Sequence, residues 1–183
     1  MASRKRKPRS KDPELALTEP AARPLWRRVL RALWRGMGLV VAFYLFLIVL
    51  FSFVPPPGNI YQWQESWRLG GIERDWVPFD QIAPEMARSV VAAEDANFCL
   101  HWGFDIAQIR DAIANGKKRG ASTISQQVVK NVFLWQGRSY TRKALEAVLT
   151  PLVELMWSKQ RILEIYLNEA EFGEGVFLSL IHI

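Results

Sequence analysis

The segment AAEDANFCLHWGFD occupies residues 92–105, and the other segments of the chain are best interpreted around it. It places two adjacent carboxylates, Glu94 and Asp95, at the end of an apolar helical pattern that opens at Pro84. Proline is favoured in the first turn of a helix, and this pattern directs Glu94 to the rim of a hydrophobic core. A half-buried carboxylate is harder to ionise, so we expect the pKa of Glu94 to rise from about 4.3 toward the range of a general base. A solvated helix end followed by a polar turn is the alternative interpretation.

The positive charge of the chain is concentrated at its N-terminus. The 183 residues carry a formal net charge of +6, yet residues 1–35 alone contain eleven Lys/Arg and three acidic residues, a balance of +8. The remainder therefore carries −2 and has no basic face of the kind that nucleic-acid binding requires. We expect no nucleic-acid partner. Half of the residues are hydrophobic, which is enough for one domain and a membrane anchor.

Cysteine and histidine are scarce. Cys99 is the only cysteine, which excludes a disulfide within the chain. The two histidines, His101 and His182, are too few for a His-rich zinc site.

Residues 36–54 read GMGLVVAFYLFLIVLFSFV and contain no charged side chain. At a rise of about 1.5 Å per residue, a helix of this length nearly spans a hydrocarbon core of about 30 Å. The segment therefore predicts a transmembrane helix. A cleaved signal peptide is the alternative, but its apolar region would be shorter and would end in small residues. Because basic residues stay on the cytoplasmic side, we expect residues 1–35 to form a cytoplasmic tail and the body to lie outside.

Residues 55–79 form a predicted linker, or membrane-proximal jaw, that begins with three prolines. Its aromatic residues, among them Trp63 and Trp67, suit either a lipid headgroup interface or packing against the domain. The periodicity of residues 80–177 is helical almost throughout, and we find no convincing alternating strand. Asp105 is placed to cap one of these helices. The sequence thus predicts a mainly α domain.

A second informative segment, GASTISQQVVKNVFL, occupies residues 120–134. On a helix, Thr123, Gln127 and Lys130 share one stripe. A second stripe is explained by core packing and comprises Ile124, Val128, Val132 and Trp135. The polar stripe suits an anionic, oxygen-rich ligand such as a diphosphate, and a helix N-terminus would assist its binding. A solvated polar face is the alternative.

Two further segments carry less information by themselves. Arg142 and Glu146 stand one helical turn apart in the segment RKALE, and a surface ion pair of that kind contributes only a few tenths of a kcal/mol. Residues 158–168, SKQRILEIYLN, form a capped amphipathic pattern that core packing explains.

Together, the four segments resemble the peptidoglycan glycosyltransferases of family 51, in particular their monofunctional, membrane-anchored branch. The resemblance covers roughly residues 60–177 and rests on four ordered motifs. These read Glu94-Asp95-x-x-Phe98-x-x-His101-x-Gly103, Gly120-x-Ser122-Thr123-Ile124-x-Gln126-Gln127-x-x-Lys130-Asn131, Arg142-Lys143-x-x-Glu146 and Ile162-Leu163-Glu164-x-Tyr166-Leu167-Asn168.

The resemblance implies a lysozyme-like helical glycosyltransferase domain behind one transmembrane helix. Family members polymerise lipid II into glycan strands and release undecaprenyl diphosphate. The family's general base falls on Glu94, which would deprotonate the acceptor 4-hydroxyl as it attacks C1 of the donor with inversion. Glu146 matches the second catalytic glutamate, with a metal-binding or diphosphate-orienting role.

The remaining site residues implied by the resemblance would bind the substrate and balance the charge of the diphosphate. They are Asp95, Phe98, His101, Thr123, Gln127, Lys130, Asn131 and Arg142. The resemblance further implies Mg²⁺ or Mn²⁺ as a possible cofactor, with no organic cofactor. The implied partners are lipid II, the growing glycan chain and other cell-wall synthesis proteins. The implied location is the bacterial inner membrane, with a single span, a cytoplasmic N-terminus and an extracytoplasmic catalytic domain.

Residues 178–183, LSLIHI, depart from the family pattern. We expect a truncated or frameshifted reading frame, so that these residues are foreign and the domain in residues 80–177 is incomplete. Hydrophobic faces around Leu152, Ile162 and Tyr166 would then be exposed and the chain would fold poorly.

Two alternative functions remain open at this point. One is a non-catalytic membrane-anchored scaffold. The other is a lysozyme-like enzyme that cleaves glycans, which would need no cations for a diphosphate.

Overall fold

The computed structural model describes residues 24–114, 122–173 and 176–177. Helices dominate these residues, so the predicted mainly α class is confirmed. The helices are α1 (Leu25–Phe51), α2 (Ile60–Leu69), α3 (Pro84–Glu94), α4 (Ile106–Ala114), α5 (Ile124–Phe133), α6 (Tyr140–Met156) and α7 (Lys159–Glu169), with a 3-10 helix η1 (Phe79–Gln81). The interpretations of residues 1–23, of the loop around residues 117–120, and of residues 178–183 with His182 lie outside the described residues.

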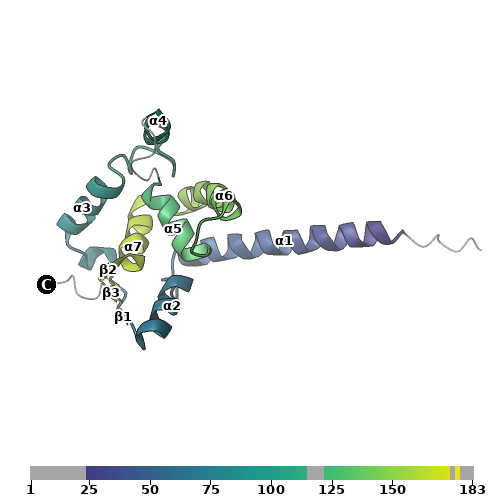
Figure 1. Cartoon of the computed structure of the whole chain (residues 1–183), viewed down its shortest axis with the longest axis horizontal. Helices are drawn as coiled ribbons and strands as arrows, with labels where there is room; N and C mark the ends of the chain where they lie inside the picture. Colours follow the sequence, from purple (N-terminus) through teal and green to yellow (C-terminus); the bar gives the residue numbers. More distant parts are fainter. Residues whose placement is uncertain (1–23, 115–121, 174–175, 178–183) are drawn as a thin grey trace, which may run out of the picture. The chain divides into compact units, whose positions relative to one another are not determined.

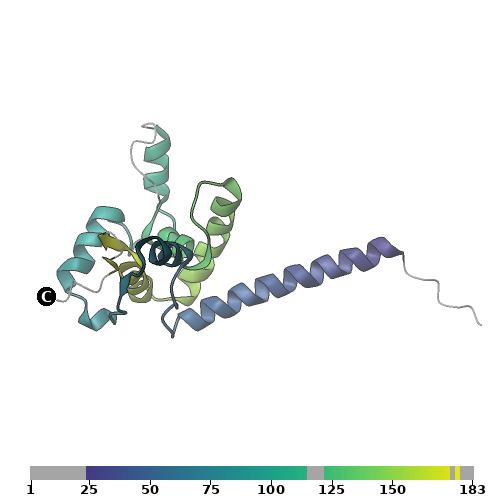
Figure 2. The same cartoon turned by 60° about the horizontal axis from the view of Figure 1, so that its bottom comes forward.

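The structure also contains strands that the periodicity did not reveal. Three short strands, β1 (Glu73–Arg74), β2 (Glu171–Gly173) and β3 (Val176–Phe177), form one sheet in the order β1-β3-β2. β1 pairs with β3 in parallel, and β2 pairs with β3 in antiparallel orientation. Figure 2 shows this sheet as small arrows. Strands of two or three residues are too short to produce a readable alternation of polar and apolar side chains.

The chain divides into two compact units, residues 1–40 and 41–183, and α1 runs across the boundary between them. α1 comprises 27 residues and is long and apolar enough to cross a membrane. It begins at Leu25, before the uncharged segment, and therefore includes Arg27, Arg28 and Arg31. Arginine is a good helix former, so these charges do not delay the start of the helix.

The core of the second unit is built around α5. This helix packs against both α6 and α7, and Figure 1 shows it between them. Its apolar stripe contributes Ile124, Val128 and Val129, which are fully buried, while Ile162 and Ile165 of α7 are equally inaccessible. The predicted core stripe is therefore confirmed for Ile124 and Val128, and Val132 packs partly buried against the core. The prediction is wrong for Trp135, which lies beyond the end of α5 and is 41% exposed. Burying each such side chain stabilises the fold by about 1.5–3 kcal/mol.

Polar side chains fix where the helices begin. The Thr123 hydroxyl accepts from the backbone N–H of Gln126 at 3.3 Å, and the Gln126 side chain accepts from the backbone N–H of Thr123 at 3.1 Å. This reciprocal capping box satisfies two donors that a helix start would otherwise leave unpaired. Asp105 caps α4 as predicted, because its Oδ1 accepts from the N–H of Gln108 at 2.9 Å.

A side chain of α7 fastens the segment that leads into α3. Asn168 is buried, its Oδ1 accepts from the N–H of Val77 at 2.8 Å, and its Nδ2 donates to the Val77 carbonyl at 2.9 Å. Both backbone groups of Val77 are thus paired by one amide. A buried backbone group without a partner would cost about 1–3 kcal/mol, so this clamp fixes the path of the chain toward η1 and α3.

The sequence predicted exposed hydrophobic faces around Leu152, Ile162 and Tyr166, and this prediction is wrong for Ile162. Ile162 is fully buried, and Leu152 and Tyr166 are half-buried. Val148 and Leu155, about one turn before and one turn after Leu152 on the same face of α6, are exposed, so the expected exposure is borne out beside Leu152. The packing of α5 against α7 covers Ile162, a pairing that periodicity within one helix does not reveal.

Gly103 allows the loop between α3 and α4 to approach α6 closely. Its φ is +83°, and an added Cβ would lie 2.5 Å from Thr150 Cγ2 and 3.1 Å from Glu154 Cγ. A side chain there would therefore meet both an unfavourable backbone conformation and a steric clash.

We expect Gly103→Ala to lower the free energy of unfolding by more than about 2 kcal/mol, the sum of backbone strain and displacement of α6. Gly70→Ala is a matched control, because Gly70 has a φ of +76° with nothing within 4 Å of an added Cβ. It should cost only about 1 kcal/mol. Thermal unfolding in detergent measures the loss of stability of both variants. Equal losses of stability in Gly103→Ala and Gly70→Ala would contradict the close approach of this loop to α6.

Candidate active site

Glu94 ends α3 and faces α5. It is exposed, so the expectation of a half-buried carboxylate is wrong, although Phe98 beside it is buried. Its Oε2 accepts a hydrogen bond from Gln127 Nε2 at 2.9 Å. The glutamate is thus oriented by the polar stripe of α5 while it remains open to solvent.

Tyr166 of α7 lies within the electrostatic reach of Glu94. Burial of the phenol, and next the negative charge of Glu94, raise the pKa of Tyr166 to about 12. The phenol therefore keeps its proton at any physiological pH and can act as a hydrogen-bond donor. Tyr166 belongs to a predicted motif, but the spacing of that motif explained it only as packing.

Asp95, the next residue after Glu94, joins three parts of the site. It is 1% exposed, its Oδ1 lies 2.8 Å from His101 Nε2, and its Oδ2 accepts from the backbone N–H of Ile124 at 3.0 Å. Ile124 is the first residue of α5, so the carboxylate sits at the positive end of that helix. One buried side chain therefore links the end of α3, the following loop and the start of α5.

The loop from Asp95 to Asp105 is held from outside by Lys159 of α7. The ammonium donates to the His101 carbonyl at 2.8 Å and lies 4.4 Å from the centre of the Phe98 ring. It also pairs with Glu154 Oε1 at 2.8 Å. Sequence reasoning missed Lys159 and Glu154, because each also has a partner far away along the chain, His101 for Lys159 and Ser125 for Glu154.

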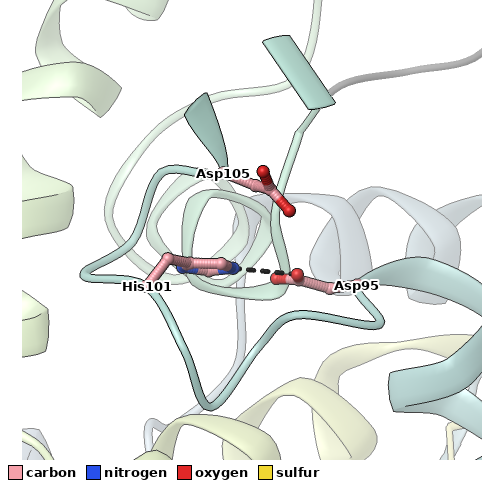
Figure 3. Close-up of side chains that lie close together, drawn as sticks. All are labelled: Asp95, His101 and Asp105. Carbon is pink, nitrogen blue, oxygen red and sulfur yellow. Dashed lines mark hydrogen bonds and ion pairs between the residues drawn. The ribbon is translucent and has the colours of Figure 1, made fainter. Parts of the chain in front are cut away.

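Asp95, His101 and Asp105 form a group whose ligand atoms lie within 4.8 Å of one another (Figure 3). These residue types suit a metal ion. The four carboxylate oxygens, however, already accept hydrogen bonds from His101, Ile124, Gln108 and Asn97. The group is thus explained as a structural junction, and we assign no metal to it.

Thr123 connects the start of α5 to the same loop. Its hydroxyl donates to the Gly103 carbonyl at 2.7 Å, in addition to capping α5. Its oxygen is therefore occupied within the protein, and its contribution to the site is to hold the helix N-terminus in place.

A second group of charged side chains lies at the start of α6. Glu146 is 2% exposed, and its Oε2 accepts from Arg142 NH1 at 2.8 Å. Its Oε1 accepts from Lys143 Nζ, which also donates to Ser122 Oγ at 3.2 Å. We call Lys130, Arg142, Lys143 and Glu146 the cationic cluster. Sequence reasoning assigned no role to Lys143, although it stands in the same motif.

Lys130 belongs to this cluster electrostatically. Burial and the positive charge of Arg142 lower the pKa of Lys130 below its ordinary value of 10.5, Glu146 acts in the opposite direction, and Lys143 lowers it further. Three cations and one carboxylate therefore share a small region with a net charge of +2, which suits a ligand with two or more negative charges.

Arg142 and Lys143 already contact the carboxylate that was predicted to bind a metal, that of Glu146. Both of its oxygens already accept from cations, and the positive charge of Arg142 and Lys143 opposes the approach of a divalent ion. Asn131, another predicted site residue, is half-buried at the end of α5, where its Oδ1 accepts from Gln136 Nε2 at 3.4 Å. Apart from Asn131, the predicted site residues thus gather in two places, around Glu94 and Asp95 and around the cationic cluster, and α5 connects the two.

Comparison with known proteins matches residues 63–178 to the family described as Transglycosylase. The chain is 65% identical over 156 residues to a biosynthetic peptidoglycan transglycosylase of Jannaschia sp. (strain CCS1), covering 85% of the chain and 65% of that relative. It is 49% identical over 164 residues to a protein of the same name from Pseudomonas putida (strain W619), covering 84% of the chain and 67% of the relative. The chain thus spans about two thirds of the length of these relatives.

The matched residues include both places where the site residues gather, and they extend over more than half of the chain. On this evidence, the chain belongs to the transglycosylase family.

Proposed function

We propose that this protein is a peptidoglycan glycosyltransferase that polymerises lipid II into glycan strands. The names of the similar proteins and the family membership support this activity. The observation that carries the proposal is the contact of 2.9 Å between Glu94 and Gln127. It orients a solvent-accessible carboxylate along the same helix that carries Lys130 and leads to the cationic cluster.

In the proposed reaction, Glu94 is the general base. Its carboxylate accepts the proton of the acceptor 4-hydroxyl while that oxygen forms a bond to C1 of the donor. The bond between C1 and the diphosphate oxygen breaks, the electron pair leaves with undecaprenyl diphosphate, and the configuration at C1 inverts. General-base assistance of this kind accelerates a reaction by about 10²–10⁴.

The leaving diphosphate needs fixed positive charge. Lys130 and Arg142 supply it, and Glu146 holds Arg142 and Lys143 in place before the substrate arrives. A lysozyme-like hydrolase would have no use for such a cluster. Mg²⁺ or Mn²⁺ stays a prediction, and the hydrogen bonds of Glu146 favour a cation-holding role for it over metal ligation.

The membrane anchor fits a lipid-linked substrate. α1 is a candidate span, and a polyprenyl diphosphate is confined to the membrane, so anchoring raises its effective concentration at the site. We propose a single span in a bacterial inner membrane, with the basic N-terminus in the cytoplasm and the site outside. Other cell-wall synthesis proteins are proposed as partners.

We predict that Glu94→Gln lowers the rate of lipid II polymerisation by about 10²–10⁴ without a change in thermal stability, because Glu94 is exposed. Glu85→Gln on the same helix is the control and should be silent, since Glu85 is exposed in the first turn of α3. Formation of glycan polymer from labelled lipid II is the measurement. Full activity of Glu94→Gln would remove the general base from the account. If the unchanged protein and both variants form no glycan polymer, the non-catalytic scaffold becomes the better explanation. Release of fragments from finished glycan strands would favour the lysozyme-like hydrolase.

We predict an alkaline decline of the rate that starts below the ordinary lysine pKa of 10.5, because burial and Arg142 lower the pKa of Lys130. As pH rises, Lys130 then loses its charge and the leaving diphosphate loses a counterion. Lys130→Arg keeps its charge at all accessible pH values and should move the decline to higher pH. Lys130→Met should lower the rate at all pH values. An unchanged alkaline limb in Lys130→Arg would show that another group controls it.

A further inference from the structure

The end of the membrane helix is built into the core of the second unit. In the part of α1 that belongs to this unit, Ile48 is fully buried and Phe51 is 8% exposed. Phe46, which precedes them, and Val49, which lies between them in the sequence, are exposed. Tyr44 is half-buried on the same face as Ile48 and Phe51. This helical spacing means that one face of the last two turns packs against protein.

Two side chains from the junction of α6 and α7 donate to carbonyls at the end of α1. Trp157 Nε1 donates to the Ile48 carbonyl at 2.7 Å. Arg161 donates to the Phe51 carbonyl with both Nε, at 3.1 Å, and NH2, at 3.0 Å.

The Phe51 carbonyl cannot accept the backbone hydrogen bond that an α-helix normally supplies from the residue four positions later. The residue four positions later is Pro55, which has no N–H to continue the helical hydrogen bonds. The guanidinium of Arg161 supplies the missing donor, and its positive charge is favourable at the negative end of a helix. Arg161 is itself held by Glu164 Oε1 at 3.1 Å and lies 5.4 Å from the centre of the Trp76 ring.

The same contacts reach α5, which carries the polar stripe of the site. The ring of Phe133, the last residue of α5, lies 6.0 Å from that of Phe51 and 5.9 Å from that of Trp157, between centroids. The Tyr44 hydroxyl donates to the Phe133 carbonyl at 3.4 Å. Lys130 stands about one helical turn before Phe133, so the site is connected to the membrane helix through packed side chains.

We propose that Trp157 and Arg161 are positioning residues that fix the height of the cationic cluster above the membrane. This inference rests on the proposed function, because height matters only for a substrate whose diphosphate lies at the membrane surface. A flexible tether would let the site sample many heights. Rigid docking of α1 holds it where the diphosphate is found.

The test measures the docking and the activity separately. Spin labels at Phe43→Cys and Val148→Cys, both exposed positions of the second unit, are introduced into a Cys99→Ser background. Their distance distribution is recorded in phospholipid vesicles for the otherwise unchanged chain and for the double variant Trp157→Phe with Arg161→Gln. Trp157→Phe keeps an aromatic ring and removes the N–H donor together with part of the ring volume.

We expect a narrow distribution for the unchanged chain and a broad one for the double variant. Polymerisation by the double variant should fall about tenfold or more in vesicles but less than twofold in detergent, where no bilayer surface fixes the substrate. Arg161→Lys, which keeps the charge but loses the paired donors, should be intermediate. Trp67→Phe and Arg110→Gln, changes of the same kind at exposed positions, should alter neither quantity.

A narrow distribution in the double variant would overturn the docking. A broad one with equal losses in vesicles and detergent, or with no loss, would overturn the positioning role. If the unchanged chain fails to polymerise lipid II, the proposed function fails and the positioning role with it, and the distances still decide whether α1 is docked.

Discussion

The arrangement of the site depends on one buried carboxylate, that of Asp95. It receives a hydrogen bond from the start of α5 and another from His101, so the end of α3 and the loop after it are tied to α5. Removing water from a carboxylate is costly, and among the described residues these donors and the positive end of α5 compensate for it. The position of Glu94, the adjacent residue, follows from this junction, since a change at Asp95 would move α3 relative to Gln127.

The cationic cluster obeys the same principle with opposite charges. Three cations close together repel one another, and burial opposes the charge on Lys130. Glu146 makes the arrangement tolerable because it is buried between Arg142 and Lys143. The repulsion between the cations is overcome during folding. The cluster is therefore already in place and needs little reorganisation when an anionic leaving group develops. This chain thus has a buried acid in each half of its site, Asp95 and Glu146.

Much of this could be predicted from the sequence, where the determinants are local. The stripe of Ile124 and Val128 and the cap at Asp105 depend on residues within one or two turns, and the structure bears them out. The exposure of Glu94 could not be predicted, because it depends on α5, which lies about thirty residues further along. The strands are too short for periodicity. The motifs identified the site residues, but partners such as Lys159 and His101, 58 positions apart, emerge only in three dimensions.

The most direct test of this account is the free energy of unfolding of Asp95→Ala compared with that of Asp95→Asn. An asparagine amide oxygen can still accept from the N–H of Ile124, whereas alanine leaves both buried donors unpaired, at about 1–3 kcal/mol each. The account predicts that Asp95→Ala loses several kcal/mol and that Asp95→Asn loses less than half as much. If Asp95→Ala unfolded within about 0.5 kcal/mol of the unchanged protein, the junction would not support the site, and the central claim would be contradicted.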